Sequence, residues 1–227
     1  MARSPFGSIF FKEYLKTRRP WISLLLLNIG LMIYIHIEFR HLFTLDHPEV
    51  VWYRTMHIGQ IHFNVLRYAP VITGLLFACL QFLPEMTAER LRLSLHLPVH
   101  PRRLILAHIL SGLVAVGLII GLDLAALALI ASRFFPAEGV SMVLITALPW
   151  ALAGITTYLG VTLALLEPDY KRKMFNLVLA AGVTALYLHH IKPYGYAPSL
   201  LLLGLLIPLM IPIIWLPVWH YRFRRVS

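Results

Sequence analysis

The sequence predicts an all-α polytopic membrane protein with six transmembrane helices, an N-terminal interfacial amphipathic helix and both termini in the cytoplasm. Hydrophobic residues make up 59% of its 227 residues and charged residues 13%, against about 25% charged residues in soluble domains. Its apolar runs approach or exceed the roughly 20 residues that a helix needs to cross a bilayer. Since no linker or charge block divides the chain, we expect a single transmembrane domain over residues 1–227.

Residues 1–19 mix aromatic and basic side chains. Helical spacing gathers an apolar side with the basic residues largely elsewhere, as in a helix lying on the inner leaflet; that side contains Phe6, Ile9, Phe10 and Tyr14. Pro20 then opens the first span, residues 21–37. No small-residue cleavage site follows this span, so we interpret it as a retained signal anchor.

Residues 38–63 are polar and aromatic, and we expect them to form the longest external loop. The segment WYRTMHIGQIHF within it predicts a short helix at the outer interface, where Trp and Tyr prefer to lie. The second span covers residues 65–83. We expect Pro70 to bend or break this helix and Pro84 to end it, because proline interrupts helical hydrogen bonding.

The remaining spans are residues 104–130, 142–166, 174–188 and 200–219. The first of these is longer than a bilayer requires, so it must tilt or project. It carries Gly117 and Gly121, whose four-residue spacing predicts close packing against another helix. We expect Pro149 to interrupt the next span.

The basic residues support this topology. Fifteen of the 20 Lys and Arg residues fall on the side that holds both termini, and five fall on the other. Cytoplasmic segments of membrane proteins are enriched in Lys and Arg, so we expect a multi-pass protein of the bacterial inner membrane. This distribution accounts for the net charge of +10 without nucleic acid as a partner.

The segment between the second and third spans, residues 85–103, is the candidate partner-binding region. It is too charged for hydrocarbon, yet it places leucines at alternate positions from Leu91 to Leu97. Exposure to water does not explain these regularly spaced leucines, whereas contact with a soluble subunit that docks on the membrane domain does. The alternative is a loop that is basic only to fix topology. Period-two alternation indicates a strand, but we favour a helix because nothing nearby would pair with an isolated strand.

In these features the chain resembles the membrane subunit of ABC-2-type ATP-binding cassette transporters. That family has an amphipathic N-terminal helix with a basic-Pro step, similar to KEYLKTRRPW here, and six spans. After the second span it has a glutamate, leucines, a Pro-Val pair and basic residues, similar to Glu85, Leu91 to Leu95, Pro98-Val99 and Arg102-Arg103. The family usually has a Gly-Thr pair where this chain has Glu89-Arg90.

The resemblance implies that residues 85–103 form a coupling helix resting on a separate ATPase. The implied ATPase contacts are Glu85, Glu89, Arg90, Leu91, Arg92, Leu95, Pro98, Arg102 and Arg103. This chain has no GxxxxGK[ST] phosphate loop, so we expect a transport subunit without catalytic residues or a cofactor of its own. Two ATPase subunits would bind ATP and Mg, and a second copy or a homologous permease would complete the complex. Lipid surrounds it, and a periplasmic or membrane accessory protein is a further expected partner.

Two ionisable residues lie within the third span. His108 is near its inner end, and Asp123 lies toward the outer headgroups, where we expect a snorkelling or salt-bridged role more than a transport role. The few charged groups favour a hydrophobic or lipid-like cargo, or a subunit that transmits motion without a polar pore. The resemblance implies export and adds peptides to the expected cargoes.

Two other functions remain open. The first is a metal-binding enzyme or metal-maturation subunit that uses outer histidines, since imidazole is a common metal ligand; these are His36, His41, His47, His57, His62, His189 and His190. The second is a structural or assembly subunit of a larger membrane complex.

Overall fold

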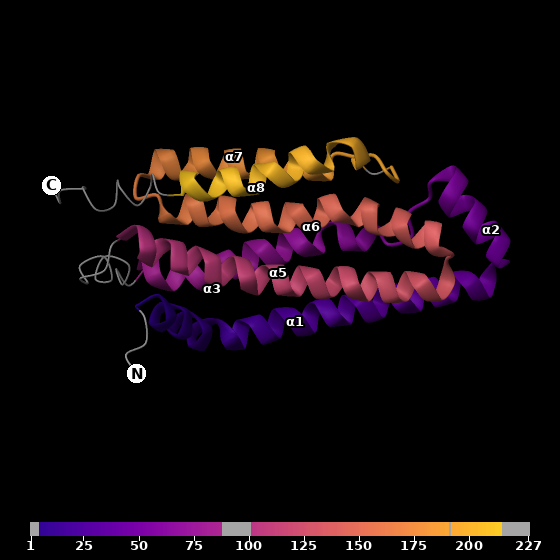
Figure 1. The fold of residues 1–227 in the computed structure, drawn as a ribbon, viewed down its shortest axis with the longest axis horizontal. Helices are drawn as coiled ribbons and strands as arrows, with labels where there is room; N and C mark the ends of the chain where they lie inside the picture. The colour runs from indigo at the N-terminus through magenta and orange to yellow at the C-terminus, as the bar shows by residue number, and fades with distance from the viewer. Residues whose placement is uncertain (1–4, 88–100, 191, 215–227) are drawn as a thin grey trace.

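The computed structural model describes residues 5–87, 101–190 and 192–214, and every regular element in these ranges is helical (Figure 1). The long helices are α1 (Pro5–Leu45), α3 (Ala69–Thr87), α5 (Pro101–Phe134), α6 (Ala137–Leu166), α7 (Tyr170–Leu188) and α8 (Leu200–Ile213). The short ones are α2 (Pro48–Tyr53), a π-helical turn η1 (Arg54–Ile58) and two 3₁₀ turns, η2 (Asn64–Arg67) and η3 (Ala197–Ser199).

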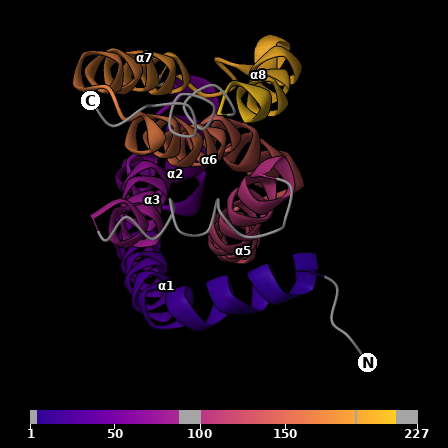
Figure 2. The ribbon, with the colours of Figure 1, turned by 90° about the vertical axis from the view of Figure 1, so that its left-hand side faces the viewer.

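The helices run back and forth along one axis in layers. Helix α6 separates α7 and α8 on one side from α3 and α5 on the other, and α1 covers the face of α3 and α5 away from α6 (Figures 1 and 2). The end of the bundle that carries α2 is called the α2 end below. At the opposite end, α1 begins, α3 ends and α5 begins.

Four helical segments of the described residues are long and apolar enough to cross a membrane: Ile9–Leu45, Asn64–Met86, Leu104–Phe134 and Ala137–Leu166. A transmembrane helix satisfies all its backbone hydrogen bonds internally, which the bilayer interior requires. This is the architecture of a multi-pass helical membrane protein, as the sequence predicts.

The first predicted boundary is wrong. Residues 1–19 and 21–37 are expected as two helices, but α1 is continuous from Pro5 to Leu45 with Pro20 inside it. Figure 2 shows the first part of α1, in indigo, lying across the end of the bundle before the helix turns to run along it. A proline within a helix removes one hydrogen bond and accounts for such a bend.

The other prolines differ in their effects. As predicted, the helix of the second span is broken at Pro70: the 3₁₀ turn η2 ends at Arg67, and α3 begins at Ala69. Pro70 lies in the first turn of α3, where its missing N–H costs nothing because that turn has no helical acceptor for it. Pro84 does not end α3, which continues to Thr87, and α6 runs through Pro149. Neighbouring helices make such interior prolines tolerable in membrane proteins.

The predicted external loop is largely helical. Helix α1 extends to Leu45, and α2 and η1 follow, which confirms the short helix expected near Trp52. Two contacts hold this region: Arg54 pairs with Asp46 at 2.6 Å, and the Trp52 indole N–H donates to the Phe134 carbonyl at 2.9 Å.

The closest helix crossing is made by glycines other than the predicted pair. A Cβ on Gly74 of α3 would collide with the carbonyl oxygen of Gly154 on α6, and a Cβ on Gly154 would lie 2.5 Å from the Pro70 carbonyl oxygen. Such contact between backbones is how small residues hold membrane helices together. A Cβ on Gly117 or Gly121 would meet no described atom within 4 Å. The close packing predicted for that pair therefore does not occur among the described residues.

Candidate functional site

A buried polar cluster lies at the end of the bundle opposite α2, where α1, α3, α5 and α6 meet. Its members are almost free of solvent although each carries a polar side chain: Glu13, Gln81, Glu85, His108 and Tyr158 are all at most 3% exposed. Burying charged groups in this way is costly unless they are paired and hydrogen-bonded. The contacts below supply that pairing.

Glu13 of α1 is the centre of the cluster. Its Oε1 lies 2.8 Å from Lys16 Nζ, one helical turn along, and 3.1 Å from Nδ1 of His108 on α5. Its Oε2 accepts a hydrogen bond of 3.0 Å from the Gln81 amide on α3. One carboxylate thus joins three helices.

Gln81 extends these contacts to α6. Its Nε2 also donates to the His108 carbonyl at 2.9 Å, and its Oε1 accepts a hydrogen bond of 2.9 Å from the Tyr158 hydroxyl. Gly112 of α5 leaves the room for this contact, since a Cβ there would lie 2.5 Å from Cζ of Tyr158 and closer still to its hydroxyl.

Glu85 lies in the last turn of α3 and pairs with α1. Its Oε1 is 3.0 Å from Lys16 Nζ and 3.6 Å from Lys12 Nζ. Lys16 therefore bridges the Glu13 and Glu85 carboxylates. The sequence leaves open whether Glu85 is a solvated surface charge, and the structure excludes this because its side chain is 3% exposed.

The cluster borders the predicted coupling segment on both sides. Glu85 lies two residues before the end of α3 at Thr87, and His108 lies two turns after α5 begins at Pro101. Six predicted ATPase contacts, Glu89, Arg90, Leu91, Arg92, Leu95 and Pro98, lie outside the described residues. Arg102 and Arg103 belong to the first turn of α5. Contact of this segment with an ATPase stays a prediction.

The paired charges of the cluster connect α1 to α3 and α5 at this end of the bundle. A paired charge buried in low dielectric holds its partners firmly, because separating them leaves an uncompensated charge. Any displacement of α3 or α5 at this end therefore acts on the first part of α1. The cluster ties the helices on either side of the coupling segment to one element.

Sequence reasoning misses most of this cluster. The expected apolar side of residues 1–19 includes Tyr14, but Tyr14 is exposed and Glu13 faces the bundle together with Thr17. One signal was available: Glu13, Thr17, Leu24 and Asn28 recur at helical spacing, and all four are buried. Only the tertiary structure shows that Gln81, His108 and Tyr158 meet this face.

His108 and Asp123, predicted as a possible intramembrane polar site, do not share one. They are fifteen residues apart on α5, about 22 Å along the helix. His108 belongs to the cluster. Asp123 faces α1, and its Oδ2 has no hydrogen-bond partner among the described residues. No salt bridge of Asp123 occurs within residues 5–87, 101–190 and 192–214, so the expected ion pair is not found there.

The outer histidines lie near the α2 end. Burial, reinforced by the positive charge of Arg54, lowers the pKa of His62 below its ordinary value. His189 and His190 stack edge to face with ring centroids 5.8 Å apart. Over the described ranges, no three His, Cys, Asp or Glu side chains are grouped so that they would hold a metal ion.

No family model, curated protein or solved structure matches this chain. Its function is therefore inferred from its own residues and geometry.

Gly112→Ala tests the packing of the cluster. The new methyl group forces Tyr158 away from Gln81, and overpacking of this kind costs about 1–3 kcal/mol. We expect a melting temperature several degrees lower in detergent, measured by intrinsic fluorescence. Gly117→Ala makes the same change on the same helix where no described atom is near, so its melting temperature should be unchanged or slightly higher. Equal effects of the two substitutions would contradict the close fit at Gly112.

Proposed function

We propose that this chain is the permease subunit of an ATP-binding cassette transporter and that the buried polar cluster couples it to a separate ATPase. The observation that carries the proposal is the pairing of Glu13 and Glu85 through Lys16, beside His108. Movement imposed on the segment after α3 reaches α1 through these contacts. The resemblance of residues 85–103 to a coupling helix supports the same conclusion.

The proposed topology has six spans with both termini in the cytoplasm of a bacterium. In it, α7 and α8 are the fifth and sixth spans, although each is shorter than the four segments that are long and apolar enough to cross a membrane. The course of the helices supports this, because α7 leads away from the end where α1 begins and α8 returns (Figure 1). Lys171, Arg172 and Lys173 begin α7 at that end, in agreement with the enrichment of basic residues on the cytoplasmic side.

The proposed complex contains two ATPase subunits, which bind ATP and Mg, and two permease subunits. The helices offer few charged groups to a polar solute, so the proposed cargo is hydrophobic, lipid-like or a peptide, and the proposed direction is export.

Replacement of Leu91 and Leu95 by Asp tests the docking of the ATPase. Two carboxylates in place of apolar side chains cannot be buried in an ATPase groove without a desolvation penalty of several kcal/mol. We expect the tagged full-length chain, purified in mild detergent, to carry a stoichiometric ATPase and Mg-dependent ATP hydrolysis, and the double variant to lose both while still inserting into the membrane. The ATPase is identified by mass spectrometry and by its phosphate loop.

Leu45→Asp is the matched control, because Leu45 is an exposed leucine that lies at the α2 end, away from residues 85–103. It should retain the ATPase. Unchanged co-purification of the Leu91/Leu95 variant, or no ATPase on the wild-type chain, would contradict the proposal. Tightly held metal instead of an ATPase would favour the metal-binding alternative. A chain that carries no metal and no ATPase would favour the assembly subunit.

A further inference from the structure

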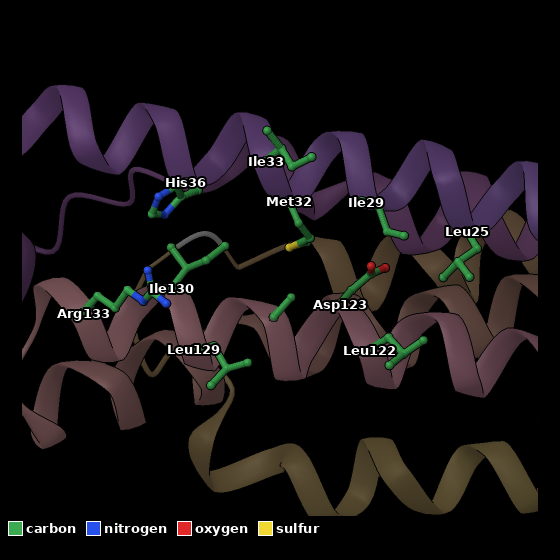
Figure 3. A pocket seen from close by; sticks show the side chains of 11 residues that line it. Leu25, Ile29, Met32, Ile33, His36, Leu122, Asp123, Leu129, Ile130 and Arg133 are labelled. Carbon is green, nitrogen blue, oxygen red and sulfur yellow. The ribbon is translucent and has the colours of Figure 1, made fainter.

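An apolar slot between α1 and α5 holds a single buried carboxylate (Figure 3). The slot has a volume of about 510 Å³, within the range of small-molecule sites. Its walls are mostly aliphatic, and its lining includes Leu25, Ile29, Met32, Ile33, Leu122 and Ile130. Asp123 points from α5 toward α1 between them.

The carboxylate of Asp123 lacks the partners that a buried charge needs. Asp123 is 4% exposed, and no basic group of the described residues pairs with it. It lies eleven residues before the end of α5, about 16 Å along the helix, within the segment Leu104–Phe134 that is long and apolar enough to cross a membrane. An unpaired carboxylate inside a membrane helix is a candidate functional group.

We propose that the slot binds a lipophilic amine, whose protonated nitrogen pairs with Asp123 and whose apolar body lies along the slot. A metal ion fits poorly, because hard cations require six or more oxygen ligands and Asp123 supplies the one carboxylate of the lining. A lipophilic cation needs only one opposite charge and apolar walls. The charge of Asp123 and the composition of the walls thus select the same ligand class.

The rim of the slot shows the route of entry. Ile33 and Leu129 are more than half exposed on the outside of the bundle, on the faces that a lipid bilayer would surround. The ligand therefore enters sideways from the bilayer. At the far end of the slot, toward the α2 end, lie Arg133 and His36, and Nδ1 of His36 has no partner in the described part of the chain. These two groups suit a hydrogen-bond acceptor at the distal end of the ligand.

Ala126 lines the slot. A cysteine introduced at this position by Ala126→Cys therefore reports whether a ligand occupies the slot. The experiment uses the full chain in detergent, with Cys79→Ala removing the native thiol, and measures the rate of maleimide labelling of Ala126→Cys. Dodecylamine at about ten times its Kd should slow labelling about tenfold by mass action, whereas dodecanol and dodecanoate, of equal chain length, should not. Val178→Cys, on an exposed position of α7, should label at the same rate with and without the amine.

Asp123→Asn should abolish the protection, and Glu138→Gln, which changes an exposed carboxylate, should preserve it.

In a second measurement, dodecylamine should raise the melting temperature of the wild-type chain but not of Ala126→Phe, which fills the slot and keeps the carboxylate. Equal protection by dodecanol or dodecanoate, or protection that survives Asp123→Asn, would overturn the proposal; protection by dodecanoate alone would indicate a lipid bound through Arg133. No ATPase takes part, so the outcome is independent of the proposed transport function.

Discussion

Glu13→Gln is expected to lower the stability of the protein more than any other single change of a polar residue. The substitution keeps the shape of the side chain but removes one of the two carboxylate charges that pair with Lys16, the one that also lies 3.1 Å from His108. Removing one partner of a buried pair costs about 3–5 kcal/mol. We expect a melting temperature lower by roughly ten degrees in detergent, at the rate of a few degrees per kcal/mol.

Glu49→Gln provides the matched control, because Glu49 is exposed in α2 and its neutralisation should change stability by less than about 0.5 kcal/mol. A double-mutant cycle with His108→Gln isolates the contact between the two side chains. The double variant should lose less than the sum of the single losses, because the imidazole and the carboxylate interact directly. A Glu13 variant as stable as the Glu49 variant would show that the cluster does not hold the helices together.

Gly74→Ala is expected to separate α3 from α6, the two helices with the most extensive mutual contact. The added Cβ would collide with the Gly154 carbonyl oxygen and lie 3.1 Å from its carbon and 3.2 Å from the Tyr158 backbone nitrogen. These are backbone atoms, so no side chain can rotate away and a helix must move. The expected cost is at least the 1–3 kcal/mol or so of ordinary overpacking, seen as a lower melting temperature.

Gly30→Ala is the control for this prediction, since a Cβ at Gly30 of α1 would meet no described atom within 4 Å. Helix propensity alone favours alanine by about 1 kcal/mol, so this variant should be as stable as the wild type or more stable. The prediction fails if both variants behave alike. Disulfide cross-linking of cysteines on α3 and α6 would report the separation directly.

The helical, membrane-spanning character of this chain follows from local sequence pattern, and the positions of the helix ends do not. Apolar runs and basic clusters are properties of contiguous residues, which is why the multi-pass helical architecture and the short helix near Trp52 could be predicted. Pro20 and Pro84 are predicted to mark boundaries and Pro149 to interrupt a span, yet the helices continue through all three. Packing against neighbouring helices decides whether a proline ends a helix or only bends it.

Glycine spacing shows the same limit. Gly117 and Gly121 have the spacing of a packing motif and meet nothing among the described residues, whereas Gly74 and Gly154, eighty residues apart, form the close crossing. The sequence shows where each glycine is, but it does not show that Gly74 and Gly154 meet. That pairing depends on which faces of α3 and α6 meet.

The amino-acid sequence by itself determined that this is a helical membrane protein, because the transfer of apolar residues into a bilayer depends on composition and length. It also indicated a basic, leucine-rich segment after residue 85. Only the tertiary structure decided that Glu13, Gln81, Glu85, His108 and Tyr158 form one buried cluster and that Asp123 lies unpaired in a slot. Both arrangements join residues from different helices, and the energy of a charge depends on the partners and the burial that folding gives it.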